Sequence, residues 1–294
     1  MNKKNIILVS VFFSPNRHIA VNRIESYAKY LAVDHNVTVI TMGDSRKTVR
    51  LKTANGDSFK VHYLPNEGFF TSLLFYTGRE GWFKHKFKTL VRIMHNKFNV
   101  SHFAGWSKQA EKKITQELES QKVEALISSY APEDVLEVSY QALNTKTKWV
   151  LDMRDEYSDE LGLSAWVKKQ RQANEIRYSK RANLVLSVSS PLVEQFKKRM
   201  PRAKNFMEVR NGFDHTIKAD QYLKSDKLKI GYFGSLHGEA KPYSFFKAII
   251  ELNIVDDVEI YFATRSVTFL IPKELREVVK FYDFMPYEES IKKM

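Results

Sequence analysis

Short hydrophobic segments recur along the whole chain, and stretches with helical spacing of apolar residues separate them. Several segments are continuous apolar runs, which is typical of strands buried on both faces of a parallel sheet. The pattern predicts strands at residues 5–13, 36–42, 59–65, 123–129, 147–153, 183–189, 205–210, 228–234, 257–263 and 278–284. It predicts helices at about residues 19–33, 83–97, 105–120, 133–143, 164–181, 190–199 and 241–252. This alternation indicates an α/β fold in which helices cross over between parallel strands.

One polar segment divides this pattern into two parts. The segment HTIKADQYLKSDK at residues 215–227 has no strong apolar period, and it separates seven predicted strands from three. Domain boundaries commonly fall in such polar connections. We therefore predict two Rossmann-like domains, at residues 1–214 and 228–294, joined by a linker at residues 215–227.

The composition restricts the class of protein. The 294 residues include 43% hydrophobic residues and no cysteine, and no run of about 18 apolar residues occurs that could form a spanning helix. We expect a globular protein without disulfides or cysteine metal sites. The N-terminal stretch MNKKNIILVSVFFSPN has a short apolar segment and no small-residue cleavage site, which favours a first strand over a targeting signal. We expect the protein to stay in the cytoplasm.

The formal charge of +13 predicts anionic partners, which include nucleic acid, anionic lipid and phosphorylated substrates. Between Phe69 and Lys108, seven Lys and Arg residues and one Glu are interleaved with ten aromatic residues. This composition suits an anionic membrane surface, and its helical spacing is unlike an exposed stacking platform for nucleic acid. A core of rings with a solvated lysine face explains the stretch equally well. The residues predicted to face a membrane are Trp82, Lys84, Lys86, Lys88 and Arg92.

The loop after the first predicted strand disfavours two classes of nucleotide-binding protein. A dinucleotide-binding turn needs G-x-G-x-x-G, whereas this loop contains no glycine, and no GxxxxGK[ST] motif occurs anywhere in the chain. A dehydrogenase and a P-loop hydrolase are therefore disfavoured. From the residues alone, Asn16, Arg17 and Arg23 are better explained by a solvated loop and helix start than by ligand contact.

Polar side chains follow a strongly apolar strand in the run KWVLDMRDEYSDE. The run places Asp152, Arg154, Asp155, Glu156 and Asp159 after the strand, at the sheet edge where open α/β proteins bind ligands. Such acids can bind hydroxyl groups or accept a proton, but they can equally cap a helix or pair with arginines. The histidines show no metal-ligand spacing and HExxH is absent, so we expect no metal site.

Two glycine-containing turns complete the candidate positions. Asn211 and Gly212 predict a tight turn out of the first domain, which requires no functional explanation. In FGSLHGEAKPYSFF, Gly234 allows a sharp turn above a strand, and the following helix start could bind an anion with Lys241 beside it. Such loops are common in α/β proteins, so the turn alone does not identify a ligand.

Four segments taken in order resemble the retaining GT-B glycosyltransferases of glycosyltransferase family 4, especially the bacterial surface-polysaccharide group. They are FFSPNRHIAVNRIESYAKYLAVDHNVTVIT, KWVLDMRDEYSDE, RANLVLSVSSPLVEQFKKRMP with VRNGFD, and LKIGYFGSLHGEAKPYSFFKAI. The resemblance covers nearly all of the chain and depends on the order and spacing of individually loose motifs. It implies sugar transfer from a nucleotide-sugar to a lipid-linked glycan acceptor, with no cofactor or bound metal, at the inner face of the plasma membrane.

The resemblance also implies roles for individual residues. Where the family often has arginine, this chain has Ser235, which leaves one charge fewer for a donor diphosphate. The basic aromatic stretch corresponds to the surface that approaches a lipid-linked acceptor, which favours the membrane interpretation. The implied catalytic residues are Asp152 and Asp155, and the implied donor-binding residues are Gly234, Ser235 and Lys241. The implied acceptor-loop residues are Ser14, Asn16 and Arg23, and the implied hinge consists of Asn211 and Gly212.

The resemblance stops before the family's pattern is complete. After DFMPYEESIKKM, the family continues with further strand and helix units, including an acidic motif that grips the donor. We therefore expect an incomplete second domain, in either a fragment of a longer enzyme or a short protein that binds its donor poorly. Two other hypotheses stay open. One is a non-catalytic protein that binds a membrane surface or a partner. The other is a nucleic-acid-binding protein, which only the net positive charge supports.

Overall fold

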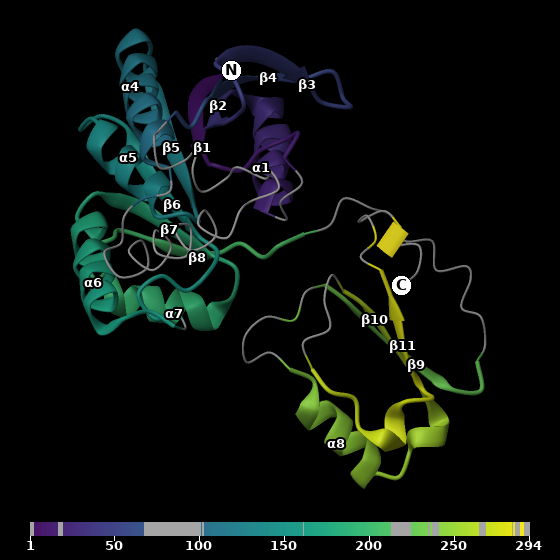
Figure 1. The fold of residues 1–294 in the computed structure, drawn as a ribbon. Coiled ribbons are helices and arrows are strands. Elements are labelled where there is room, and N and C mark those ends of the chain that lie inside the picture. Colours follow the sequence, from purple (N-terminus) through teal and green to yellow (C-terminus); the bar gives the residue numbers. More distant parts are fainter. Residues whose placement is uncertain are drawn as a thin grey trace, which may run out of the picture. The chain divides into compact units, whose positions relative to one another are not determined.

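The chain forms two compact units, Met1–Phe213 and Asp214–Met294. The structure is a computed structural model that describes residues 3–16, 20–67, 101, 103–160, 162–212, 225–234, 236, 241–264, 269–283, 285 and 289–290 (Figure 1). Each unit contains its own mostly or wholly parallel sheet, so the predicted α/β class with two Rossmann-like sheets is confirmed. The predicted linker lies largely outside the described residues, and its limits stay a prediction.

An eight-stranded sheet forms the centre of the larger unit, in the order β3-β4-β2-β1-β5-β6-β7-β8. All its pairings are parallel except that of β3 with β4. The strands are β1 (Lys4–Val9), β2 (His35–Met42), β3 (Lys47–Lys52), β4 (Ser58–Leu64), β5 (Val123–Tyr130), β6 (Lys148–Met153), β7 (Ala182–Ser187) and β8 (Phe206–Glu208). Strand order reverses at β1, which lies between β2 and β5, and this is where doubly wound sheets open a ligand site.

Helices cover the two faces of this sheet. Ile6 and Leu8 of β1 pack with α1 on one face, whereas Ile7 and Val9 point to the opposite face and join a cluster with the other four helices. The apolar residues of β1 are therefore buried on both faces of the sheet, as expected for a central parallel strand. The helices are α1 (Ala20–Asp34), α4 (Ala104–Ser120), α5 (Asp134–Ala142), α6 (Ala165–Ser179) and α7 (Ser190–Arg199).

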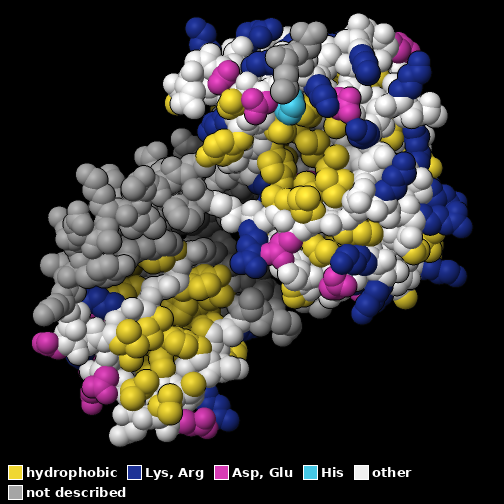
Figure 2. All heavy atoms as spheres, turned by 180° about the vertical axis from the view of Figure 1, so that it is seen from behind, with side chains coloured by type: hydrophobic (Ala, Val, Ile, Leu, Met, Phe, Trp, Pro, Cys, Tyr) yellow, Lys and Arg dark blue, Asp and Glu magenta, His cyan; other side chains and the backbone are white. Residues whose placement is uncertain are grey.

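The smaller unit has three parallel strands in the order β11-β10-β9. They are β9 (Leu228–Phe233), β10 (Val258–Ala263) and β11 (Val279–Tyr282), with α8 at Tyr243–Glu251 and short 3-10 turns at Val255–Asp257 and Lys273–Leu275. Phe246 of α8 is fully buried and packs edge-on against Phe262 of β10. Several large apolar residues of this unit stay exposed, including Leu228, Leu252 and Leu270, and Figure 2 shows hydrophobic side chains gathered on one of its faces.

The predicted helix at 83–97 and the predicted membrane-facing residues lie outside the described part of the chain. Those residues are Trp82, Lys84, Lys86, Lys88 and Arg92. Among the residues that are described, no helix combines the length and the apolar character that crossing a membrane requires.

Candidate functional site

Polar side chains from α1, β5 and β6 meet beside the point where the strand order of the larger sheet reverses. Asp152 lies near the end of β6, Ser129 lies near the end of the neighbouring β5, and Arg23 comes from the first turn of α1. The carboxyl ends of parallel strands share one sheet edge, so residues far apart in the sequence are brought together here.

Asp152 is fully buried and both of its oxygens are hydrogen-bonded. Arg23 Nη2 donates to Asp152 Oδ1 at 2.8 Å, and Arg23 Nε lies 3.1 Å from each carboxylate oxygen. Tyr27 donates its hydroxyl to Oδ1 at 3.3 Å and Ser129 donates to Oδ2 at 2.8 Å. The carboxylate is thus enclosed by the protein's own donors, and in this conformation it has no contact with solvent.

The electrostatics of this cluster follow from burial and the Arg23–Asp152 pair. Burial alone lowers the pKa of the Arg23 guanidinium, but the hydrogen bonds and the charge of Asp152 outweigh it and raise that pKa. Burial, reinforced by the Asp152 carboxylate, raises the pKa of the Tyr27 hydroxyl well above its usual range. Tyr27 therefore acts as a neutral donor to Asp152.

Arg23 also joins the cluster to the chain after β8. Its Nη1 lies 3.3 Å from the Arg210 carbonyl oxygen and 3.2 Å from Asn211 Oδ1. Asn211 and Gly212, the predicted hinge, are exposed. Two predicted groups, an acceptor-loop residue and a hinge residue, are therefore in direct contact through one guanidinium.

Arg154 and Asp155 are the polar groups of the cluster that remain available. Arg154 is half-buried; its Nε donates to the Tyr130 carbonyl at 2.7 Å and its Nη1 lies 3.5 Å from the Ala20 carbonyl. Within the described residues it forms no ion pair, and burial lowers the pKa of its guanidinium. Asp155 is exposed, and it makes no hydrogen bond or ion pair with other described residues.

The remaining acids of the 152–159 run pair with basic residues of α6 and α7. Arg199 Nη1 donates to Glu156 at 2.8 Å, Arg199 Nη2 donates to Asp159, and Lys168 pairs with Asp159 at 2.7 Å. The alternative structural role of these acids as arginine partners therefore applies to Glu156 and Asp159.

Ser14 and Asn16 of the first loop make local hydrogen bonds. The Ser14 carbonyl accepts a hydrogen bond from the Tyr63 hydroxyl at 2.5 Å, and the Asn16 backbone N–H donates to the Phe13 carbonyl at 3.0 Å. Asn16 itself is exposed and Ser14 is half-buried.

In the smaller unit, the predicted donor-site glycine has a backbone conformation that favours glycine. Gly234 follows β9 with φ at 152°, and its N–H donates to the Ala263 carbonyl at 3.0 Å. Lys241 is exposed and lies just before α8, with its ammonium 6.0 Å from the centre of the Tyr243 ring. Ser235 lies outside the described residues.

Sequence analysis named Arg154 among the polar residues that follow the predicted strand at 147–153 but gave it no role, and it selected neither Tyr27 nor Ser129. Ser129 is the last residue of the predicted strand at 123–129, so its place at the carboxyl end of a strand could have selected it. Tyr27 gave no such signal because it lies on the apolar face of the predicted helix at 19–33. No cluster of three or more potential metal ligands occurs in the described parts of the chain.

Comparison with known proteins shows similarity in fold. No protein-family model and no curated protein matches the sequence. A glycosyltransferase from Rickettsia africae ESF-5 is 13% identical, with a TM-score of 0.52 over 97% of this chain and 69% of that one. An E. coli trehalose-6-phosphate structure bound with UDP-2-fluoro glucose is 8% identical, with a TM-score of 0.56 over 99% and 76%. Arabidopsis thaliana UGT89C1 complexed with UDP-L-rhamnose is 12% identical, with a TM-score of 0.56 over 99% and 72%.

These likenesses establish the fold at a coarse level. The chain has the α/β architecture of GT-B glycosyltransferases, and it spans 69 to 76% of the length of the three solved chains. At such low identities the similarity applies to architecture alone. The narrower resemblance to glycosyltransferase family 4 stays a prediction.

Proposed function

We propose that this protein is a glycosyltransferase that moves a sugar from a nucleotide-sugar donor to a hydroxyl group of a glycan acceptor. The observation that carries the proposal is the combination of a GT-B architecture with a polar cluster beside the switch point of the larger sheet. Two of the similar solved structures are complexed with UDP-sugars or a fluorinated UDP-sugar, which supports a UDP-sugar as the first donor to test.

In the transfer step, the bond between the anomeric carbon and the donor's phosphate oxygen breaks, and the nucleoside diphosphate leaves with the electron pair. The acceptor hydroxyl oxygen bonds to the anomeric carbon and loses its proton. Asp155 is the exposed carboxylate of the cluster, so it is suited to bind the acceptor hydroxyl and receive that proton. The guanidinium of Arg154 is held by its hydrogen bond to the Tyr130 carbonyl oxygen and pairs with no carboxylate among the described residues. It is therefore suited to bind substrate oxygens.

We assign Asp152 a positioning role. Its carboxylate accepts hydrogen bonds from Arg23, Tyr27 and Ser129. It therefore fixes the positions of Arg23 and of the end of β5, and these in turn shape the site. The donor side belongs to the smaller unit, where we propose that Gly234, Ser235 and Lys241 bind the donor diphosphate. The exposed ammonium of Lys241 supplies the positive charge.

The remaining features of the proposal come from the family resemblance. They are retention of the anomeric configuration, membership of family 4, a lipid-linked acceptor in cell-surface polysaccharide synthesis, and peripheral attachment to the inner face of the plasma membrane. The absence of a cofactor or metal requirement belongs to the same set. Each of these features is narrower than the fold similarity and needs its own measurement.

Calorimetric titration of the chain with UDP- and GDP-sugars tests the donor part of the proposal. We expect one of these donors to bind, and Lys241→Gln to weaken its binding by roughly tenfold, because one charge-assisted contact to a phosphate is lost. The matched control is Lys247→Gln, an exposed lysine within α8, which we expect to leave the affinity unchanged. If no UDP- or GDP-sugar binds, the proposal fails.

Release of the nucleoside diphosphate tests the catalytic part. We expect Arg154→Gln to lower kcat/KM at least about tenfold, the equivalent of one hydrogen bond made to substrate, while Arg154→Lys recovers part of the activity. Arg202→Gln is the control because Arg202 is exposed and forms no ion pair with described residues. Equal activity of the Arg154→Gln and Arg202→Gln variants would remove Arg154 from the site.

A further inference from the structure

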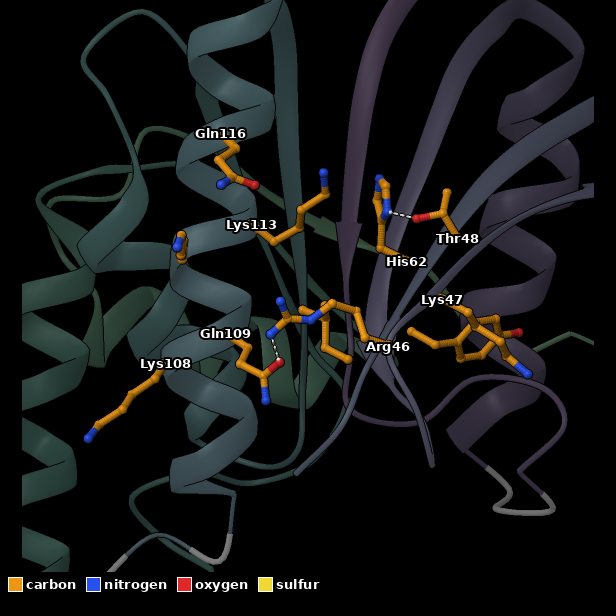
Figure 3. Close-up of a pocket in the computed structure, with 11 residues that line it drawn as sticks. Arg46, Lys47, Thr48, His62, Lys108, Gln109, Lys113 and Gln116 are labelled. Atoms are coloured by element: carbon orange, nitrogen blue, oxygen red, sulfur yellow. Dashed lines mark hydrogen bonds between the residues drawn. The ribbon is translucent and has the colours of Figure 1, made fainter. Parts of the chain in front are cut away.

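A pocket lies on the larger unit, away from β5 and β6. It has a volume of about 430 Å³ and lies between the start of β3, the end of β4 and one side of α4 (Figure 3). This volume is in the range of small-molecule sites, roughly 300 to 1,000 Å³. Arg46 and Lys47 line it from the β3 side, and Lys108, Lys112 and Lys113 line it from α4.

The positive charge of this pocket is only partly neutralised. Glu117, the acid next to the pocket, has its oxygens 2.9 Å from Lys113, 3.0 Å from Lys60 and 3.0 Å from His62 Nε2. These groups, His62 and then the two lysines, hold the pKa of Glu117 well below its usual range despite its burial. Glu117 therefore stays ionised and its charge is already fully used.

Four cations of the pocket have no such partner. Arg46, Lys47, Lys108 and Lys112 are exposed and form no ion pair with any described residue. The residues that line the pocket include no Asp or Glu. The pocket therefore presents about four uncompensated positive charges to whatever enters it.

Placing these charges together has a cost for the helix itself. Lys108 and Lys112 are four residues apart on α4, and like charges at this spacing destabilise a helix by about 0.2–0.5 kcal/mol. A bound anion would remove this repulsion.

The neutral side chains of the pocket fix its walls. Arg46 Nη2 donates to Gln109 Oε1 at 2.5 Å, and Gln109 Nε2 donates to the Pro65 carbonyl at 2.7 Å. Thr48 Oγ1 lies 2.7 Å from His62 Nδ1, and Figure 3 shows this pair on the β side of the pocket and Gln109 on the α4 side. Arg46, which precedes β3, is thus fixed by a hydrogen bond to a residue of α4.

We propose that this pocket binds a ligand that carries two linked phosphoryl groups. A single phosphate monoester carries a charge of about −1.5 to −2 at neutral pH, which would leave about half of the four free cations uncompensated. Two linked phosphoryl groups can contact cations on the β3 side and on α4 at the same time, and the planar Arg46 guanidinium suits paired phosphoryl oxygens. The ligand is either a soluble diphosphate or the diphosphate headgroup of a lipid, and both present the same chemistry to the pocket.

Titration of the full chain with inorganic pyrophosphate at physiological salt tests this inference. The pocket variant is Arg46→Gln/Lys108→Gln/Lys112→Gln, which replaces exposed side chains only. The matched control, Lys198→Gln/Arg202→Gln/Lys204→Gln, removes the same residue types and charge from exposed positions at the end of α7 and between α7 and β8. We expect the wild type and the control to bind pyrophosphate with equal affinity, and the pocket variant to bind it at least about tenfold more weakly, because three charge contacts are lost.

Phosphatidylcholine vesicles with and without a diphosphate-bearing lipid distinguish the two sources. If the pocket variant loses pyrophosphate binding and vesicle binding together, the ligand is a lipid headgroup; if it loses pyrophosphate binding alone, the ligand is soluble. Equal pyrophosphate affinities of the pocket variant and the control, or no pyrophosphate binding by the wild type, would refute the site. The single variant Lys112→Gln, with an expected loss of a few fold, keeps the test valid if the triple variant does not fold.

Discussion

A carboxylate without contact to water needs hydrogen-bond donors for its oxygens, since an unpaired buried charge is very costly. Asp152 meets this requirement with Arg23, Tyr27 and Ser129, which come from α1 and β5. Asp155, three residues further along, needs no such partners because it is exposed. Two acids that look equivalent in the sequence therefore differ in what they can do: one fixes the site and the other can reach a ligand.

The Arg23–Asp152 pair gives the first stability prediction. Asp152→Asn leaves the Arg23 guanidinium, with 7% of its side chain exposed, without its counter-charge. Breaking a buried pair in this way costs about 3–5 kcal/mol of unfolding free energy, which urea denaturation measures. Asp155→Asn serves as the control and should change the unfolding free energy by less than about 0.5 kcal/mol. A cost for Asp152→Asn no larger than that of the control would mean that the pair is not a significant source of stability.

At the scale of elements, the hydrophobic pattern predicted the sheet well and missed one strand. All ten predicted strands are present, whereas β3, with the sequence KTVRLK, was not predicted. β3 is an edge strand in which only Val49 and Leu51 are apolar and both are only half-buried, so it carries no buried-strand signal. Its omission mattered, because Arg46 and Lys47 at its start form one wall of the basic pocket.

The candidate site was predictable only in part, and for a physical reason. The strand-end rule located Asp152 and Asp155 from one local run of sequence. The contact of Arg23 with Asp152 joins positions 129 residues apart, and it depends on the strand order rather than on any local pattern. The sequence alone therefore does not tell whether Asp152 is buried against an arginine or faces a ligand.

The docking of α6 against α7 contains a further buried acid and gives a pH prediction. Glu175 of α6 is 1% exposed, accepts a hydrogen bond from Ser158 at 2.8 Å and lies 3.8 Å from Arg199 of α7. Burial raises the pKa of Glu175 to about 7. Because the pKa is higher in the folded than in the unfolded state, the associated stability is present in full below the unfolded-state value and is lost as the pH rises to about 7.

Glu175→Gln should therefore change the pH dependence of unfolding. We expect the variant to match the wild type near about pH 4 and to be more stable by about 2–3 kcal/mol near about pH 8, because glutamine imitates the protonated acid. Thermal and urea denaturation across this range measure the difference. Glu111→Gln, at an exposed position of α4, is the control and should show no such trend. A difference between Glu175→Gln and the wild type that does not grow with pH would contradict the assignment.

At the scale of the whole molecule, the fold is shared with proteins that have almost no sequence in common with it. Identities of 8 to 13% accompany TM-scores of 0.52 to 0.56. The property that such chains share is the order of continuous apolar strands and intervening helices, since this order determines which surfaces must be buried. The composition does not distinguish the fold: a charge of +13 predicts anionic ligands but not where they bind.

The two units should differ strongly in independent stability. Among the described residues, the larger unit has eight strands and two extensive buried clusters. The described part of the smaller unit has three strands, one nine-residue α-helix and a single small cluster. Small units bury a smaller fraction of their surface and are marginally stable, and the exposed Leu228, Leu252 and Leu270 add to this. We expect residues 1–213 expressed alone to unfold cooperatively, and residues 214–294 alone to show weak or no cooperative unfolding.

Calorimetry and circular dichroism of the two fragments and the full chain measure this difference. The full chain should show a weak transition at low temperature and a main transition that coincides with that of fragment 1–213, since the main transition reports the larger sheet. An excess of ligand that binds the smaller unit should raise only the first transition, because binding stabilises the unit that holds the ligand. If fragment 1–213 is unfolded while the full chain melts in a single transition, the two units are not independent and the larger core is insufficient by itself.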